Sequence, residues 1–73
     1  MQGHSGAQFN LGVCFDVGRG VTMDKKKALK YFILAAEQGL SKAQYNCGTK
    51  HYNGEATERD EGKALKFFEL AAA

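Results

Sequence analysis

Hydrophobic and polar positions follow the same order twice along this chain. From Asp24 to Ala36, a polar start and a lysine-rich turn lead into aromatic, leucine and alanine positions, and this order returns from Asp60 to Ala72. Nine of the thirteen residues recur unchanged at an offset of 36, and Tyr31 recurs as another aromatic ring. The spacing is typical of an amphipathic helix. A fixed period of this length indicates stacked supersecondary units.

Polar residues before each apolar run and glycines after it predict where the helices begin and end. Ser5 and Ser41, each followed three residues later by glutamine, predict capping boxes. Asp24 and Asp60 are expected to cap the other two helices, and glycines are expected to end the helices. The predicted helices cover residues 6–17, 25–38, 42–53 and 61–73.

Short loops join these helices, so consecutive helices are expected to be antiparallel neighbours. The period extends over the whole chain and places repeat 1 at residues 2–37 and repeat 2 at residues 38–73. The predicted fold class is all-α, an α-α superhelix (solenoid) of two helix-turn-helix repeats of 36 residues.

The first predicted helix is apolar on two opposite sides. With about 100° between successive residues, one side is formed by Ala7, Leu11, Cys14 and Phe15, and the other by Phe9, Val13, Asp16 and Val17. Such a helix is either buried on both sides or presents one side to a partner. We expect the first set to form the core within the repeat. Gly12 needs a packing reason, because a glycine in mid-helix costs about 1 kcal/mol relative to alanine.

Composition narrows the classes of function. The chain has 73 residues, 44% hydrophobic and 25% charged, which fits one small globular domain. Its net charge of +2 gives no support for a nucleic acid or membrane partner. We find no apolar run near eighteen residues, no signal peptide and no lipidation motif. The compartment stays open, with the cytoplasm favoured.

The periodic residues carry a family resemblance. The first copy reads Ala7-x-x-x-Leu11-Gly12-x-x-Phe15-x-x-Gly18-x-Gly20-Val21-x-x-Asp24-x-x-Lys27-Ala28-x-x-Tyr31-Phe32-x-x-Ala35-Ala36-Glu37-Gln38-Gly39. This pattern closely resembles the Sel-one-like repeat, an α/α solenoid unit similar to the tetratricopeptide repeat. The resemblance implies a scaffold or adaptor that binds a protein or peptide on a concave face made by the first helix of each repeat, with no catalytic residues.

The second copy departs from this family pattern. Cys47 and His51 stand where the family favours leucine and tyrosine, and Ala56-Thr57 replaces the second glycine and the valine of the loop. The resemblance therefore predicts the same fold with a looser second loop.

Cys47 and His51 lie one helical turn apart and are the residues with the most evident chemical potential. A zinc site needs four ligands and a nucleophile needs an orienting group, and the sequence supplies neither. We therefore favour packing over chemistry here and predict no enzyme, no metal and no cofactor. A Cys14–Cys47 disulfide stays open, although helices packed about 8–10 Å apart disfavour it against two reduced thiols.

The lysine run at residues 25–27 could contact phosphates, but such a run at a helix start is more often a solvated face. The better candidate is the predicted concave face. Analogy with the tetratricopeptide repeat assigns to it Phe9, Val13, Asp16, Val17, Lys42, Tyr45, Thr49, Tyr52 and Asn53. For Phe9 and Tyr45, a packing role between neighbouring repeats is an equally good interpretation.

A second hypothesis concerns assembly. In a two-repeat solenoid the outer faces of the first and last helices have no neighbouring repeat, so we expect both to expose apolar surface. Such complementary ends could join copies of the chain head to tail or exchange helices, which gives a homo-oligomer.

Overall fold

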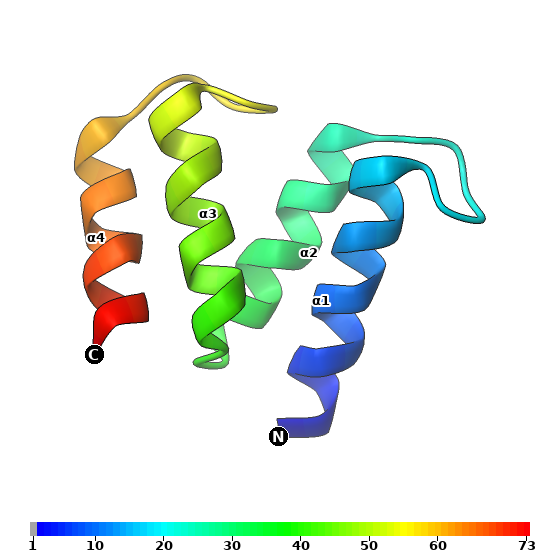
Figure 1. The fold of residues 1–73 in the computed structure, drawn as a ribbon, viewed down its shortest axis with the longest axis horizontal. Helices are drawn as coiled ribbons and strands as arrows, with labels where there is room; N and C mark the ends of the chain where they lie inside the picture. The colour runs from blue at the N-terminus through cyan, green and yellow to red at the C-terminus, as the bar shows by residue number, and fades with distance from the viewer. Residues whose placement is uncertain (1) are drawn as a thin grey trace.

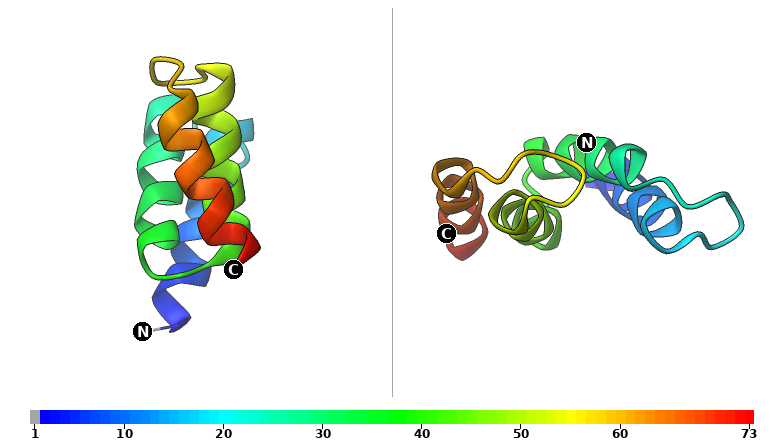
Figure 2. Two further views of the ribbon diagram at one scale, coloured as in Figure 1. Left: turned by 90° about the vertical axis from the view of Figure 1, so that its left-hand side faces the viewer. Right: turned by 90° about the horizontal axis from the view of Figure 1, so that it is seen from above.

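The structure is a computed structural model that describes residues 2–73, with side chains from residue 4 onward. It contains four α-helices, α1 (Gln2–Val17), α2 (Lys25–Glu37), α3 (Ser41–Asn53) and α4 (Glu61–Ala72), and no strand in the described range. The helices lie in one row, with α1 and α4 at its ends (Figure 1). Seen from above, the row does not close into a four-helix bundle (Figure 2). The predicted all-α repeat fold is confirmed.

The second helix of each repeat begins as predicted. The Asp24 carboxylate accepts a hydrogen bond from the backbone N–H of Lys27 at 3.1 Å, and Asp60 accepts one from Lys63 at 3.0 Å. Each aspartate also donates its own backbone N–H to a carbonyl near the end of the preceding helix, at 2.8 Å in both copies. These paired bonds fix the loop against the helix before it.

The predicted capping boxes are wrong. Ser5 is buried inside α1, which begins at Gln2, upstream of the expected start. In the second copy Leu40 takes the N-cap position and makes no side-chain capping bond. The three-residue connection between α2 and α3 explains this difference, because the Leu40 carbonyl already accepts the N–H groups of Ala43 and Gln44. Of Gln2 and Gly3, which carry part of the predicted register, only the helical backbone is described.

The core lies where α1, α2 and α3 meet, and Phe32 is its largest member at 1% exposure. The Phe32 ring lies against the α1 backbone at Gly12, where an added Cβ would come within 2.7 Å of the ring. Gly48 and Phe68 repeat this arrangement in the second copy, with an added Cβ at 2.6 Å. A side chain at either glycine would therefore displace a ring, which is the packing reason that the sequence required.

The predicted assignment of the two sides of α1 is wrong for part of the helix, although Phe15 packs against the core as predicted. Ala7 and Leu11 are exposed, whereas Phe9 and Val13 are partly buried against the core. Gly12 gives the physical reason, because the Phe32 ring fills the space above it and Phe9 packs beside that ring, with centroids 5.5 Å apart. The equivalents of Ala7 and Leu11 in α3, Ala43 and Cys47, are fully buried members of the same core.

The second loop keeps the backbone path of the first one at a cost in strain. Gly20 has a φ of 76°, and its equivalent Ala56 has a φ of 65° although it carries a side chain. A residue with a Cβ in this left-handed region costs about 1–2 kcal/mol. Ala56 packs against the core cluster, and this burial offsets part of the cost.

Candidate functional site

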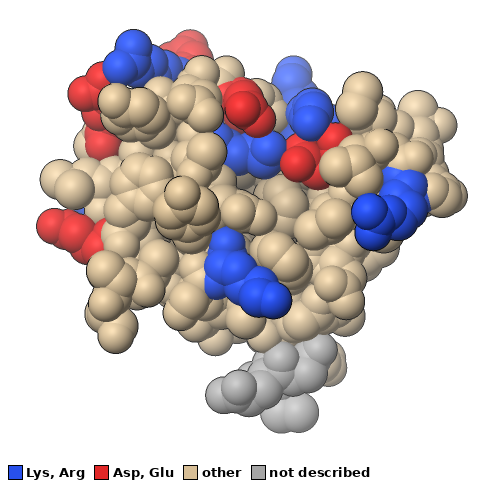
Figure 3. Space-filling model, viewed as in Figure 1, with Lys and Arg blue, Asp and Glu red and all other residues tan. Residues whose placement is uncertain are grey.

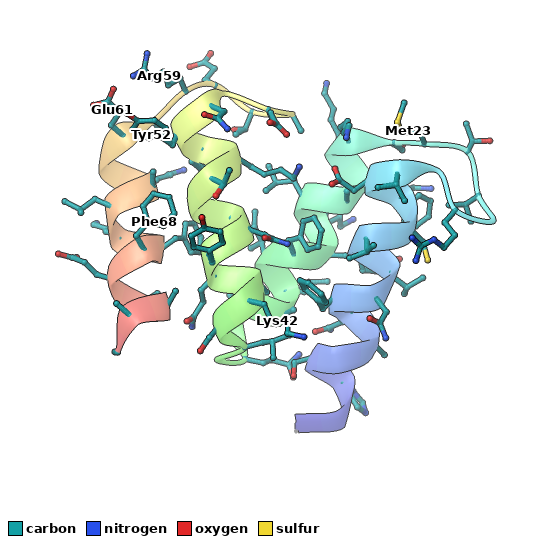
Figure 4. The ribbon with its side chains drawn as sticks, in the orientation of Figure 1. Met23, Lys42, Tyr52, Arg59, Glu61 and Phe68 are labelled. Carbon is teal, nitrogen blue, oxygen red and sulfur yellow. The ribbon has the colours of Figure 1, made fainter. Side chains whose placement is uncertain are left out.

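The nine residues predicted for the concave face come from α1 and α3 and differ in how much surface they offer. Lys42 and Tyr52 lie toward opposite ends of α3 (Figure 4). The exposed members are Val17, Lys42, Tyr45, Tyr52 and Asn53, and the partly buried members are Phe9, Val13, Asp16 and Thr49. We use the name first-helix face for this set. In the orientation that shows Lys42 and Tyr52, most of the molecular surface is uncharged (Figure 3).

Two aromatic pairs repeat at the offset of 36 residues. Phe9 packs on Phe32, and its equivalent Tyr45 packs on Phe68 with ring centroids 5.6 Å apart. Both pairs are tilted, which is a favourable geometry for aromatic rings. Lys42 places its ammonium 5.5 Å from the Phe9 ring centroid and so reaches from the second repeat to the first. Phe9 thus has the packing role that the sequence left open, whereas Tyr45 packs and remains 59% exposed.

Asp16 takes part in an ion-pair network that joins the two repeats. Lys50, with a side chain only 8% exposed, donates to Asp16 at 3.0 Å and to Glu55 at 3.0 Å. Lys25 also donates to Asp16, at 3.2 Å to the carboxylate and 2.8 Å to the backbone carbonyl. Both ammonium groups contact Oδ1 of Asp16, whose side chain is 22% exposed, so this carboxylate is engaged within the fold.

Opposing effects set the pKa values of this network. Burial alone would raise the pKa of the Asp16 carboxyl, but hydrogen bonds from Lys50 and Lys25 hold it below its ordinary value. Burial alone would lower the pKa of the Lys50 ammonium, but its bonds to Asp16 and Glu55 raise it above its ordinary value. Both groups are therefore charged at neutral pH, and their attraction offsets the cost of partly burying them.

The sequence analysis did not identify Lys50 as part of the site, although comparison of the two repeats indicates its ion pairing. Its equivalent in the first copy is Cys14, which is partly buried, whereas Lys50 is buried. A lysine that replaces such a residue needs a carboxylate within reach, since isolated buried charges are strongly unfavourable. Asp16 and Glu55 supply it from different repeats.

Thr49 and Tyr52 of the first-helix face are held by nearby residues. The Thr49 hydroxyl donates to the Tyr45 carbonyl at 3.1 Å, one turn earlier in α3. Tyr52 is 50% exposed, and the Arg59 guanidinium lies 5.4 Å from its ring centroid. Arg59 also pairs with Glu61 at the start of α4 (Figure 4). Tyr52 is therefore positioned by the second loop while one side of its ring stays open.

Cys47 and His51 are held in a packing role. The His51 Nδ1 donates to the Cys47 carbonyl at 2.8 Å, and the ring packs on Phe67 with centroids 5.4 Å apart. Cys47 is fully buried, and this burial raises the pKa of its thiol to about 12. A thiol that stays protonated at neutral pH is a poor nucleophile and a poor metal ligand. Cys14 and Cys47 are both free, so the disulfide considered above is not formed.

The described residues offer neither a metal-binding cluster nor a membrane-spanning helix. Residues 2–73 contain no cluster of three or more His, Cys, Asp or Glu side chains that could hold a metal ion. No helix in this range combines the length and the apolar character needed to cross a membrane.

The lysine run of residues 25–27 is partly used within the fold. Lys25 binds Asp16, and the Lys27 ammonium lies 5.1 Å from the centroid of the Phe15 ring. This arrangement agrees with a solvated helix face better than with a phosphate site.

Comparison with known families identifies the repeat. The family model described as "Sel1 repeat" matches residues 5–40 and 41–73, two segments that begin 36 residues apart. The chain belongs to the Sel1 repeat family. Sel1 repeats are generally protein–protein interaction modules, and their fold is of the scaffold type rather than the catalytic type. The predicted family is thereby confirmed, and the interaction role is a general property of that family.

Solved structures agree with this assignment. The chain is similar to a Sel1 repeat protein from Oxalobacter formigenes, with 34% identity, a TM-score of 0.90 and coverage of 93% of this chain. It is also similar to c5321, a protective antigen of uropathogenic Escherichia coli strains with an SLR fold, at 35% identity, a TM-score of 0.91 and 97% coverage. The chain spans 28% and 15% of those two proteins. No curated protein matches.

The two Sel1 repeats of this chain use the same positions differently. Phe15 and Tyr31 stack in the first repeat, with centroids 5.8 Å apart and planes 1° from parallel, where His51 and Phe67 meet in the second. The second repeat thus has the imidazole of His51 at the position where the first repeat has the phenyl ring of Phe15.

Proposed function

We propose that this pair of Sel1 repeats is a non-catalytic interaction module that binds a protein or peptide on its first-helix face. The observation that carries the proposal is the exposure of Tyr45 and Tyr52, at 59% and 50%, on a helix that is packed on both neighbours. The two tyrosines are seven residues apart, so they lie on the same side of α3 roughly 10 Å from each other. Rigid, half-exposed aromatic rings are typical anchors of interfaces.

The neighbouring residues suggest the chemistry of the partner. Val17 adds apolar surface to the face, and Asn53 and Lys42 add an amide and a charge at opposite ends of α3. Asp16 contributes by fixing α1 against α3 through Lys50, so its role in binding is to shape the face. A peptide that offers apolar side chains at a helical spacing, with polar groups between them, fits such a row.

The double variant Tyr45→Ala/Tyr52→Ala tests this proposal. Proteins captured from a cell extract by the immobilised wild-type chain are first identified by mass spectrometry, and the best of them is purified. We expect the double variant to bind it at least about tenfold more weakly, because each anchor ring contributes on the order of 1 kcal/mol or more. Leu34→Ala, on α2, is the matched control and should bind like the wild type. Equal affinity of the double variant would contradict the assignment of the face.

Self-assembly is the second candidate function, and a difference between equivalent leucines favours it. Leu29 is 6% exposed because α3 covers α2, whereas its equivalent Leu65 on α4 is 58% exposed. The α3 residues in that contact include Ala43 and Cys47, and their equivalents on α1, Ala7 and Leu11, are exposed. The α1 surface of one copy could therefore cover the α4 surface of another as α3 covers α2.

Light scattering over a concentration series tests assembly. We expect the average mass to rise with concentration, and Leu65→Glu to keep the chain monomeric, because a carboxylate in the contact would be desolvated. Leu34→Glu is the matched control, placed at an exposed leucine outside the proposed contact. A monomer at all concentrations, or equal effects of the two variants, would rule out this contact.

A further inference from the structure

A hollow of about 400 Å³ opens between α2, α3 and α4, away from the first-helix face. Its lining is apolar apart from three nitrogen-bearing side chains and consists of Ile33, His51, Lys63, Lys66, Phe67 and Leu70. His51 lies on the opposite side of α3 from Lys42 and Thr49, since these are separated from it by roughly 180° and 160° around the helix. Viewed from the side, α4 stands in front of both α2 and α3 (Figure 2).

His51 brings a free hydrogen-bonding atom to this hollow. The side chain is 5% exposed, and its Nδ1 is the donor to the Cys47 carbonyl. The proton on Nδ1 leaves Nε2 of the neutral ring as an acceptor, and no partner for Nε2 is found in the described part of the chain. No fully buried side-chain nitrogen or oxygen in that part lacks a partner, so Nε2 must reach open space. The space that His51 lines is the hollow.

The charged residues that line the hollow are of one sign. Lys63 and Lys66 line it from α4, and both are exposed, whereas no carboxylate is among the lining residues. Phe67, Ile33 and Leu70 form its apolar part. A ligand that fits must offer a hydrogen-bond donor to Nε2, an apolar group for the walls and negative charge for the lysines.

We propose that this hollow binds a short acidic peptide segment through one apolar side chain. The backbone N–H of the peptide donates to His51 Nε2, the apolar side chain fills the hollow, and flanking carboxylates pair with Lys63 and Lys66. The site is separate from the first-helix face and does not rest on the function proposed for it. In the first repeat the equivalent of His51 is Phe15, which has no acceptor atom.

The test uses the 73-residue chain and the capped peptide acetyl-Glu-Asp-Leu-Asp-Glu-amide. Nuclear magnetic resonance of the imidazole nitrogens follows the titration, with His4 as the internal control because it is exposed on α1. We expect a saturable shift of the His51 Nε2 signal and an unchanged His4 signal. The same peptide with glycine in place of leucine is expected to bind at least about tenfold more weakly, because it leaves the walls uncovered.

Variants distinguish specific binding in the hollow from non-specific electrostatic attraction. Lys63→Glu/Lys66→Glu is expected to abolish the shift, whereas Lys27→Glu/Lys30→Glu, the equivalent change in the first repeat, is expected to leave the affinity within about twofold. His51→Phe introduces the residue of the first repeat and is expected to lower the affinity at least about tenfold. Because this variant has no imidazole at position 51, the backbone amide signals of α4 report its binding. Leu70→Ala, at an exposed wall, should weaken binding without altering the core.

Three results would overturn the proposal. Equal losses in the two lysine double variants would indicate unspecific attraction, and equal binding of the glycine peptide would show that the hollow is not used. Unchanged affinity in a folded His51→Phe or Leu70→Ala variant would exclude the named contacts. Tyr45→Ala/Tyr52→Ala should leave this titration unchanged, so failure of one site is distinguishable from failure of the other.

Discussion

Phe32→Ala is expected to lower the free energy of unfolding by about 3–5 kcal/mol. The ring is 1% exposed and lies at the contact of α1, α2 and α3, against the Gly12 backbone and beside Phe9. Loss of the ring leaves a cavity that Gly12 cannot fill, because it has no side chain. A domain of this size has little stability to spare, so most of the variant should be unfolded at room temperature. Urea denaturation followed by circular dichroism measures the change.

Phe68→Ala is the matched control for this prediction. Phe68 packs on Gly48 and Tyr45 in the same way, but it is only partly buried and no further helix in the described range covers it. We therefore expect a loss of about half that of Phe32→Ala, because the stability change scales with the apolar area removed from contact. Equal losses in the two variants would mean that the repeats share stability evenly and that the contact with α3 adds nothing to Phe32.

Much of the fold follows from the period of 36 residues. The caps at Asp24 and Asp60 were predictable because each aspartate carboxylate accepts a hydrogen bond from a backbone N–H only three residues further along the chain. Gly12 was also informative, because an unfavourable residue in mid-helix signals a close contact. These inferences rest on local chemistry that the sequence displays directly.

The sides of α1 were not predictable from periodicity. Both sides carry apolar residues, and the choice between them depends on where the Phe32 ring lies, which is a contact between helices. The helix start predicted at Ser5 was wrong for a related reason. The serine side chain suits an N-cap, but the helix already begins at Gln2. Local preferences are weak compared with tertiary packing, so helix starts are the features that they predict least well.

The candidate site was predictable in part. Tyr45 and Tyr52 could be selected because analogy with the tetratricopeptide repeat assigns them to the concave face, and both are exposed on α3. The ion pair of Asp16 with Lys50 could not, because it joins residues 34 positions apart in different repeats. The hollow at His51 was equally inaccessible, since it is formed by three helices and needs the tautomer that the Cys47 carbonyl selects.

Charge reversal at Asp16 is expected to unfold the domain in part rather than to report on binding. Asp16→Lys would place a third ammonium group beside Lys50 and Lys25, with Lys50 only 8% exposed. Removal of one partner from a buried ion pair costs on the order of 3 kcal/mol, and the repulsion adds to this cost. Urea denaturation at neutral pH should show the loss. Stability within about 0.5 kcal/mol of the wild type would show that the network is not formed in solution.

Asp16→Asn and Lys25→Met resolve the origin of the effect. Asp16→Asn keeps the shape of the side chain and should cost about 1–2 kcal/mol at neutral pH, because Lys50 retains Glu55. Lys25→Met removes only the exposed partner and should cost less than about 0.5 kcal/mol. Because the folded state lowers the pKa of Asp16, its charge stabilises the fold above the ordinary pKa of 3.8, and this contribution is lost as the pH falls through the lowered value. The difference between wild type and Asp16→Asn should therefore shrink in acid, whereas a difference independent of pH would indicate lost packing instead of lost charge.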